Sequence, residues 1–152
     1  MSVQLPQNIA TRPVTVIGGG TLGRRIALMF ASGGADVRIF DLADAVRSAA
    51  VAYVEQTLPS VVAAREGAVA GTVQGADELA SAVLNAWLVV EAVPERIELK
   101  TSVFGDLDRL APADAILASN SSSFASRLMI DEVSAPERVL NMHFYMPPQQ
   151  NA

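Results

Sequence analysis

Residues 13–41, PVTVIGGGTLGRRIALMFASGGADVRIFD, decide the fold of this chain. They begin with four β-branched residues, VTVI at positions 14–17, which predict a short buried parallel strand. Three glycines follow at the G-x-G-x-x-G spacing: Gly18, Gly20 and Gly23. Apolar residues then recur at helical spacing, and a second apolar run, VRIF, leads to Asp41. The stretch therefore predicts a strand, a glycine turn, a helix and a second strand, in that order.

This glycine turn has the features of a dinucleotide-binding site. Gly18 permits the tight turn from strand to helix, Gly20 lets the backbone approach a pyrophosphate, and Gly23 lets the helix pack closely on the strand. Thr21 and Leu22 open the helix, whose free N–H groups and partial positive charge attract the pyrophosphate. The alternative is a glycine-rich turn in another kind of α/β domain, but glycines flanked by strand, helix and strand favour the cofactor site.

Asp41 indicates which cofactor binds. It lies 21 residues after Gly20, at the expected tip of the second strand, where a carboxylate can accept hydrogen bonds from an adenosine ribose. A carboxylate at this place repels a 2′-phosphate, because both groups are negative. The sequence therefore predicts NAD rather than NADP.

Composition argues against several other classes of protein. The 152 residues predict one domain, and no apolar run approaches the roughly 18 residues that span a membrane. Cysteine is absent and there is one histidine, so we expect neither disulfides nor a metal site. The net charge of −5, with no basic cluster beyond Arg24 and Arg25, argues against nucleic acid as a partner. The first residues lack the pattern of a signal peptide, and we expect a cytoplasmic location.

The rest of the chain alternates predicted strands with predicted helices. A helix is expected over residues 43–65, kinked or split at Pro59, and a short helix over residues 124–130. This alternation predicts a Rossmann-type α/β fold, a doubly wound and mainly parallel sheet with helices on both faces. Ligands of such sheets lie beyond the carboxyl ends of the strands. There the sequence places the glycine turn, Asp41 and the polar segments 91–95, 119–123 and 143–145.

Three blocks of the sequence, taken in order, resemble one known family: VIGGGTLGRRIA with VRIFD, LVVEAVPERIELK, and ASNSSSF with RVLNMHFYMPP. Over nearly its whole length the chain is similar to the N-terminal NAD-binding domain of the L-3-hydroxyacyl-CoA dehydrogenases, which include 3-hydroxybutyryl-CoA dehydrogenase. Members of the family show a serine–asparagine–x–serine–serine turn and, further on, a histidine in an HFxxP block. Here Ser122 precedes His143 by 21 residues. The resemblance implies NAD-dependent oxidation of a 3-hydroxyacyl-CoA, or of a smaller 3-hydroxy acid, to the 3-keto compound.

The resemblance also implies roles for single residues. His143 would be the general base that takes the proton of the substrate's 3-hydroxyl, a task that suits an imidazole at neutral pH. Ser122 would hydrogen-bond the substrate oxygen. Asn120, Glu95 and Lys100 would line the nicotinamide half of the cofactor site. The glycines and the acid of the first stretch would hold the pyrophosphate and the adenosine.

Each of these roles has a simpler structural alternative. A single histidine near a strand end is often structural, and serines in a turn are often helix caps, as Ser122 and Ser123 would be for the expected helix 124–130. Glu95 can be an acid favoured at a helix N-terminus, with Lys100 as its surface neighbour. Burial and hydrogen bonds distinguish these alternatives.

The chain departs from the family pattern in four places. The family orients its histidine with a glutamate further along and adds a helical C-terminal domain for substrate binding and dimerisation, whereas the printed sequence ends at Ala152, before both. We therefore expect this chain alone to be weakly active or inactive, and the full-length enzyme to be a homodimer. Met146 replaces the usual asparagine of the HFxNP block. Arg47 is the only candidate base for CoA in the helix that follows Asp41.

Three functional interpretations result. The first is a dehydrogenase acting on a small-molecule substrate, an acyl-CoA, with this chain as its cofactor-binding half and with no membrane or nucleic-acid partner. The second is a catalytically silent NAD-binding module, favoured by the missing glutamate. The third is a dehydrogenase of a hydroxy acid without CoA, favoured by Met146 and by the scarcity of basic residues.

Overall fold

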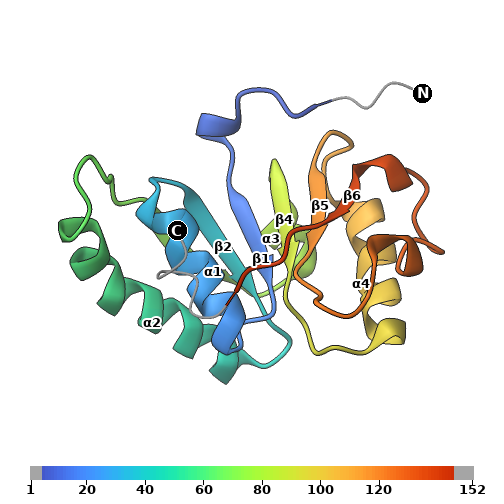
Figure 1. The fold of residues 1–152 in the computed structure, drawn as a ribbon, viewed down its shortest axis with the longest axis horizontal. Helices are drawn as coiled ribbons and strands as arrows, with labels where there is room; N and C mark the ends of the chain where they lie inside the picture. The colour runs from blue at the N-terminus through green and yellow to red at the C-terminus, as the bar shows by residue number, and fades with distance from the viewer. Residues whose placement is uncertain (1–4, 146–152) are drawn as a thin grey trace.

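The computed structural model describes residues 5–145 and contains, in this part of the chain, six strands joined by helices (Figure 1). The strands are β1 (Val14–Ile17), β2 (Asp36–Phe40), β3 (Thr72–Ala76), β4 (Leu88–Glu91), β5 (Ile116–Ser119) and β6 (Val139–Asn141). The α-helices are α1 (Thr21–Ser32), α2 (Asp44–Ala63), α3 (Leu79–Val83) and α4 (Ile97–Leu110). Short 3₁₀ segments are η1 (Ile9–Thr11), η2 (Ser126–Leu128) and η3 (Pro136–Arg138).

The strands form one parallel sheet in the order β3-β2-β1-β4-β5-β6. The chain winds outward from β1 to β3, then crosses back and winds outward again from β4 to β6. The reversal lies between β1 and β4, which pair from Val14 with Leu88 to Ile17 with Glu91. This topology confirms the doubly wound Rossmann fold predicted from the sequence, and ligands of such folds bind at the reversal.

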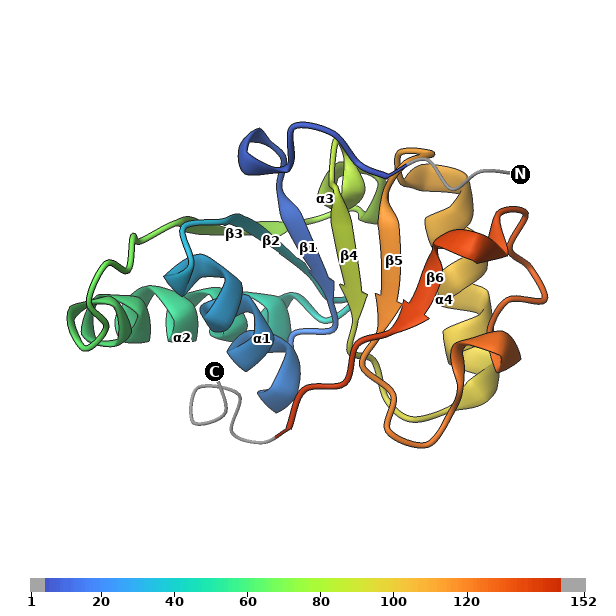
Figure 2. The same cartoon turned by 45° about the horizontal axis from the view of Figure 1, so that its top comes forward.

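Helices cover both faces of the sheet (Figure 2), because successive side chains of a strand point to opposite sides. Val16 and Val90 pack into one core with side chains of α1 and α2. Ile17 and Val89 pack into a second core with side chains of α3 and α4. Since both faces are covered, the central strands β1 and β4 are buried along their length and mostly apolar rather than alternating.

The glycine turn lies against the backbone that follows β4 and brings α1 close to the end of β1. Gly18 has φ = +100°, and a Cβ there would lie 2.7 Å from the carbonyl oxygen of Ala92. A Cβ on Gly23 would lie 1.8 Å from the carbonyl oxygen of Gly18. Gly18 is therefore needed for its backbone conformation and Gly23 for close packing, as the sequence predicts.

A buried ion pair fixes the last strand to α4. Nη2 of Arg138 donates hydrogen bonds to Oδ1 of Asp108 (2.9 Å) and to the backbone carbonyl oxygen of Asp108, and Nη1 donates to the carbonyl oxygen of Pro112. Oδ2 of Asp108 accepts hydrogen bonds from the backbone N–H and the hydroxyl of Ser134. Burial raises the pKa of Asp108, but the bonds from Ser134 and Arg138 lower it by more, to about 2. The pair anchors β6, the strand that leads to His143.

Of the two effects expected of Pro59, a kink or a split of helix α2, the split does not occur. One continuous helix runs from residue 44 to residue 63. Proline removes the hydrogen bond to the carbonyl four residues earlier, that of Glu55. Both residues are exposed, so water can bond to the carbonyl that is left without a helical partner.

The expected helix over residues 124–130 is wrong, because this segment contains only the 3₁₀ turn η2. The backbone N–H of Ser126 donates to the side-chain oxygen of Asn141, 2.7 Å away. The amide group of Asn141 donates in turn to the carbonyl oxygen of Phe124. The start of the segment is therefore hydrogen-bonded to β6, and its remaining local bonds are those of the 3₁₀ turn.

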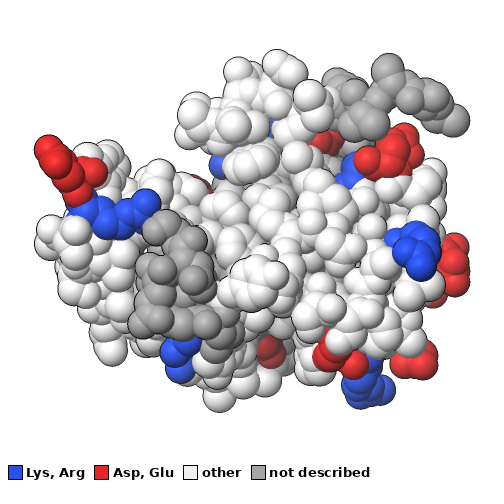
Figure 3. Space-filling model, viewed as in Figure 1, with Lys and Arg blue, Asp and Glu red and all other residues white. Residues whose placement is uncertain are grey.

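Within residues 5–145 no helix combines the length and the apolar character needed to cross a membrane. In the same residues no group of His, Cys, Asp and Glu side chains is arranged to hold a metal ion. On the face drawn in Figure 3, charged side chains lie mainly around the rim. Exposed large apolar side chains include Leu128 and Leu140, and Tyr145 is exposed as well.

Candidate active site

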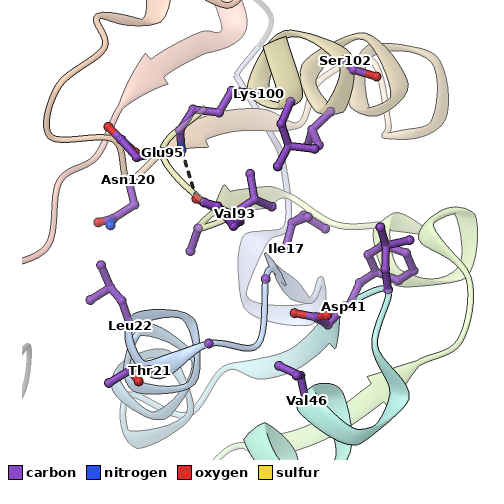
Figure 4. A pocket seen from close by; sticks show the side chains of 18 of the residues that line it. Ile17, Thr21, Leu22, Asp41, Val46, Val93, Glu95, Lys100, Ser102 and Asn120 are labelled. Carbon is purple, nitrogen blue, oxygen red and sulfur yellow. Dashed lines mark hydrogen bonds and ion pairs between the residues drawn. The ribbon is translucent and has the colours of Figure 1, made fainter. Parts of the chain in front are cut away.

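A cavity of about 880 Å³ opens at the carboxyl ends of the central strands. Every predicted site residue lines it except Gly23, which is buried behind the turn: Gly18, Gly20, Thr21, Leu22, Asp41, Glu95, Lys100, Asn120, Ser122 and His143. Figure 4 shows Asp41 and Val46 on one side of the cavity, and Asn120, Glu95 and Leu22 on the other. The cavity therefore joins the glycine turn to both predicted ends of the cofactor site.

The first turn of α1 borders the cavity and suits an anion. None of its residues, 21–24, is acidic, and no side chain caps this end of the helix. Its N–H groups therefore keep their partial positive charge. A Cβ on Gly20 would meet no atom within 4 Å, so the backbone is open to a ligand there. These features fit the pyrophosphate of NAD.

Asp41 is held rigidly at the tip of β2. Its Oδ2 accepts a hydrogen bond from the backbone N–H of Gly19 (2.8 Å), and its Oδ1 accepts one from that of Ala43 (2.9 Å). Each carboxylate oxygen has a second lone pair for a ribose hydroxyl. Leu42, 88% exposed, and Val46 supply an apolar rim beside it. This side of the cavity fits an adenosine.

Arg47 does not provide the expected base for CoA. Its guanidinium is buried and forms ion pairs within the domain: Nη2 contacts the carboxylates of Asp77 (2.7 Å) and Asp44 (3.1 Å). Nη1 donates to the carbonyl oxygen of Asp41. Arg47 therefore fixes the start of α2 against the segment after β3.

The opposite side of the cavity rests on a buried carboxylate, Glu91, which is 0% exposed at the end of β4. Its Oε1 accepts hydrogen bonds from Nζ of Lys100 and from the backbone N–H of Val93, both at 2.7 Å. Its Oε2 accepts one from the hydroxyl of Ser119 (2.7 Å). Sequence reasoning gave Glu91 no role, although an acid inside the apolar strand WLVVEAV was a usable signal, because a buried carboxylate needs partners.

Lys100 is the partner of this carboxylate, so the alternative of a surface neighbour is wrong. Its side chain is 1% exposed. The ammonium group has three acceptors: Glu91 at 2.7 Å, Glu95 at 3.2 Å and the carbonyl oxygen of Val93 at 3.3 Å, the last drawn in Figure 4. Three acceptors match its three N–H donors. Lys100 therefore holds both ends of the 91–95 turn that forms a wall of the cavity.

Glu95 is tied to the serine turn. Its Oε1 accepts hydrogen bonds from the hydroxyl of Ser121 and from the backbone N–H of Ser123. Burial raises the pKa of Glu95, but the bonds from Ser121 and Lys100 lower it by more, so the net pKa lies below its usual value. Ser121 also accepts the N–H of Phe124 (2.9 Å). Ser121 therefore makes the turn's side-chain hydrogen bond to a backbone N–H, and neither Ser122 nor Ser123 caps η2, although the structural alternative assumed that they would cap a helix here.

The two predicted catalytic residues border the same cavity. Nδ1 of His143 lies 3.0 Å from the backbone carbonyl oxygen of Asn120. Oδ1 of Asn120 accepts the backbone N–H of Phe144 (2.8 Å), which leaves the amide NH₂ of Asn120 available as a donor. Across residues 5–145, no hydrogen bond joins Ser122 to His143. Their catalytic roles stay predictions, and Met146 lies outside the described residues.

The site residues, from the glycine turn to His143, are spread over almost the entire sequence. The similarity of this chain to known proteins covers the same length. Residues 13–151 match the family model described as 3-hydroxyacyl-CoA dehydrogenase, NAD binding domain. The chain belongs to this family. The cofactor of this 3-hydroxyacyl-CoA dehydrogenase NAD-binding domain is accordingly NAD.

Named relatives agree with the family. A 5-formyl-3-hydroxy-2-methylpyridine 4-carboxylate 5-dehydrogenase of Mesorhizobium japonicum is 36% identical over 140 residues, which cover 90% of this chain and 45% of that protein. The human mitochondrial hydroxyacyl-coenzyme A dehydrogenase is 30% identical over 152 residues, covering 93% of this chain and 48% of that protein. The crystal structure of 3-hydroxybutyryl-CoA dehydrogenase from Escherichia coli K12 superposes with a TM-score of 0.79 at 29% identity, covering 90% of this chain and 30% of that one. This NAD-binding domain thus spans about half the length, or less, of the relatives it matches.

Proposed function

We propose that this domain is the cofactor-binding half of an enzyme that oxidises a 3-hydroxyacyl-CoA, or a smaller 3-hydroxy acid, to the 3-keto compound. The observation that carries the proposal is one shared cavity. His143 and Ser122 line the same space as the open glycine turn and Asp41. A proton acceptor and a hydroxyl therefore border the site that fits the cofactor, as oxidation of an alcohol requires.

The chemistry divides between the cofactor and this chain. Asp41 and the first turn of α1 would hold the adenosine and the pyrophosphate of NAD, and the wall formed by Glu95 and Asn120 would border the nicotinamide. When bound there, NAD supplies the acceptor for the hydride that leaves C3 of the substrate. His143 takes the proton of the 3-hydroxyl as the C–O bond becomes a carbonyl. Ser122 hydrogen-bonds the substrate oxygen and holds it near the imidazole.

The first test is a calorimetric titration of this chain with NADH and then with NADPH. We expect binding of NADH in the micromolar to low-millimolar range and weaker binding of NADPH, because Asp41 repels a 2′-phosphate. Gly20→Val is the matched variant, since its side chain fills the open space beside the turn. Ala49→Val, on the exposed face of α2, is the control for a valine added elsewhere. Equal binding to the wild type and Gly20→Val would overturn the proposed cofactor site.

A second candidate substrate class, a hydroxy acid or alcohol without CoA, is supported by Arg47. This base is bound to Asp44 and Asp77 and is not free to meet a CoA phosphate. The compound in the name of the Mesorhizobium relative is also not a CoA ester. Turnover of acetoacetyl-CoA with NADH by the full-length enzyme, without turnover of the free acids, would eliminate this class. NADH binding without turnover of any of these compounds would instead support a catalytically silent module.

We also propose that the full-length enzyme is a cytoplasmic homodimer without nucleic-acid or membrane partners. The net charge of −5 supports the lack of a nucleic-acid partner. Exposed apolar side chains such as Leu128 and Leu140 support a further protein contact. Light scattering coupled to size-exclusion chromatography of the full-length enzyme tests the dimer, and a monomer at micromolar concentration would contradict it.

A further inference from the structure

We propose that Asn120 is a positioning residue that fixes the tautomer of His143, so that Nδ1 carries the proton and Nε2 is the free base. The assignment of His143 as a general base rests on the proposed function. The tautomer itself rests only on contacts within this chain, so it can be tested without substrate or cofactor.

The geometry begins with the ladder between β5 and β6. Ser119 pairs with Asn141, and the carbonyl oxygen of Ser119 then accepts the N–H of Met142 (2.8 Å). The strand pairing ends here, and Asn120 makes the next contacts between the two segments. Its backbone carbonyl oxygen contacts Nδ1 of His143 at 3.0 Å, and its side-chain Oδ1 accepts the N–H of Phe144 at 2.8 Å. One residue thus holds two successive residues of the segment that carries the imidazole.

The identity of the acceptor decides the proton's position. A carbonyl oxygen can only accept a hydrogen bond, so Nδ1 of His143 must donate. A neutral imidazole has a single N–H, and Nε2 therefore keeps its lone pair. Because Asn120 is only 7% exposed, water competes poorly for its carbonyl oxygen. This orienting contact lies inside the domain.

Two ring contacts support the same placement. The ring of Phe144 meets Phe30 of α1 edge-on, with centroids 6.2 Å apart. The imidazole of His143 meets the ring of Tyr145 edge-on, at 5.0 Å. These contacts restrict the segment in space, but neither supplies a hydrogen-bond acceptor to Nδ1. Asn120 is therefore the group that selects between the two tautomers.

The test uses the fact that the chain has one histidine. The full chain is labelled with ¹⁵N-histidine, and long-range ¹H–¹⁵N correlation spectra are recorded at about pH 8.5, where an ordinary imidazole is neutral. Such spectra distinguish the protonated from the bare nitrogen, and couplings to the two ring C–H groups assign each to Nδ1 or Nε2. We expect a protonated Nδ1 and a bare Nε2. A proton mainly on Nε2, or an even mixture, would overturn the proposal.

Three variants test the part played by the side chain. Asn120→Ala removes the acceptor for the Phe144 N–H, and we expect the single tautomer to shift to a mixture of both. Asn120→Asp keeps an acceptor oxygen at that place, now of a carboxylate, and should retain the Nδ1–H form. Ser123→Ala, a polar-to-alanine change at an exposed position of the same turn, should also retain it. A wild-type spectrum in Asn120→Ala, or a mixture in folded Asn120→Asp, would remove the side chain from this role.

The same samples separate this proposal from the proposed function. NADH binding together with a proton on Nε2 would overturn the positioning role and leave the cofactor site intact. The Nδ1–H tautomer without NADH binding would support the positioning role and count against the cofactor site. If Asn120→Ala does not fold, the wild-type and Asn120→Asp spectra still decide the question.

Discussion

Replacing Asp108 by asparagine should destabilise this domain at neutral pH, and the loss should shrink in acid. The pKa of Asp108 is about 2 in the folded chain, against an ordinary value of 3.8. At about 1.4 kcal/mol for each pKa unit, the difference corresponds to about 2.5 kcal/mol of stability at pH 7. Because the folded pKa is the lower one, this contribution is present above pH 3.8 and is lost as the pH falls toward 2. About 1 kcal/mol of it should be lost by pH 3, and about 2 kcal/mol by pH 2.

Urea unfolding of the wild type and Asp108→Asn at pH 7, 4 and 3 measures this effect. Asp106→Asn is the matched control, because Asp106 lies on the same helix and forms an exposed ion pair with Arg109. An exposed pair contributes about 1 kcal/mol or less. A loss for Asp108→Asn that is as large at pH 3 as at pH 7, or no larger than for Asp106→Asn, would refute the reasoning.

Four further predictions concern the site. Asp41→Ala should weaken NADH binding and bring the affinities for NADH and NADPH closer together in calorimetry; an unchanged ratio would remove Asp41 from the ribose site. Gly23→Ala should lower the melting temperature sharply, since its Cβ would lie 1.8 Å from a carbonyl oxygen, whereas Gly20→Ala should melt like the wild type. Glu91→Gln should cost about 3 kcal/mol in urea unfolding because it leaves a buried ammonium with one carboxylate fewer, and a loss under about 1 kcal/mol would contradict this. His143→Ala should leave NADH affinity within about twofold while ending turnover in the full-length enzyme, since a general base contributes to chemistry more than to cofactor binding; a large loss of affinity would make His143 structural.

Much of the fold could be predicted because its decisive signals are local. The run at 14–17 is β-branched, the glycines follow at fixed spacing, and Asp41 ends the next strand. Each of these signals depends on neighbours in the sequence, and the structure places all three as expected. The gathering of polar residues at one edge also follows, because parallel strands end on the same side.

The contacts that site residues make with distant segments could not be predicted from the sequence. The serine turn looked like the start of a helix, but Asn141, on another strand, takes the hydrogen bonds that the helix would need. Arg47 looked free for a ligand until Asp77, from beyond β3, was found beside it. Lys100 was placed at the cofactor site, but its burial against Glu91 depends on how α4 packs on β4. In each case the partner lies many residues away, and only the folded chain brings the two together.

The two halves of the site differ in how they are supported. The glycine turn and Asp41 follow β1 and β2, and each of these strands has a neighbour on both sides. His143 follows β6, a three-residue strand that pairs, in the described part of the chain, with β5 alone. Local opening of the fold should therefore begin at β6, where few backbone hydrogen bonds have to break. Amide hydrogens of residues 139–144 should exchange with solvent faster than those of β1, so the chain can release its imidazole while the cofactor half stays folded.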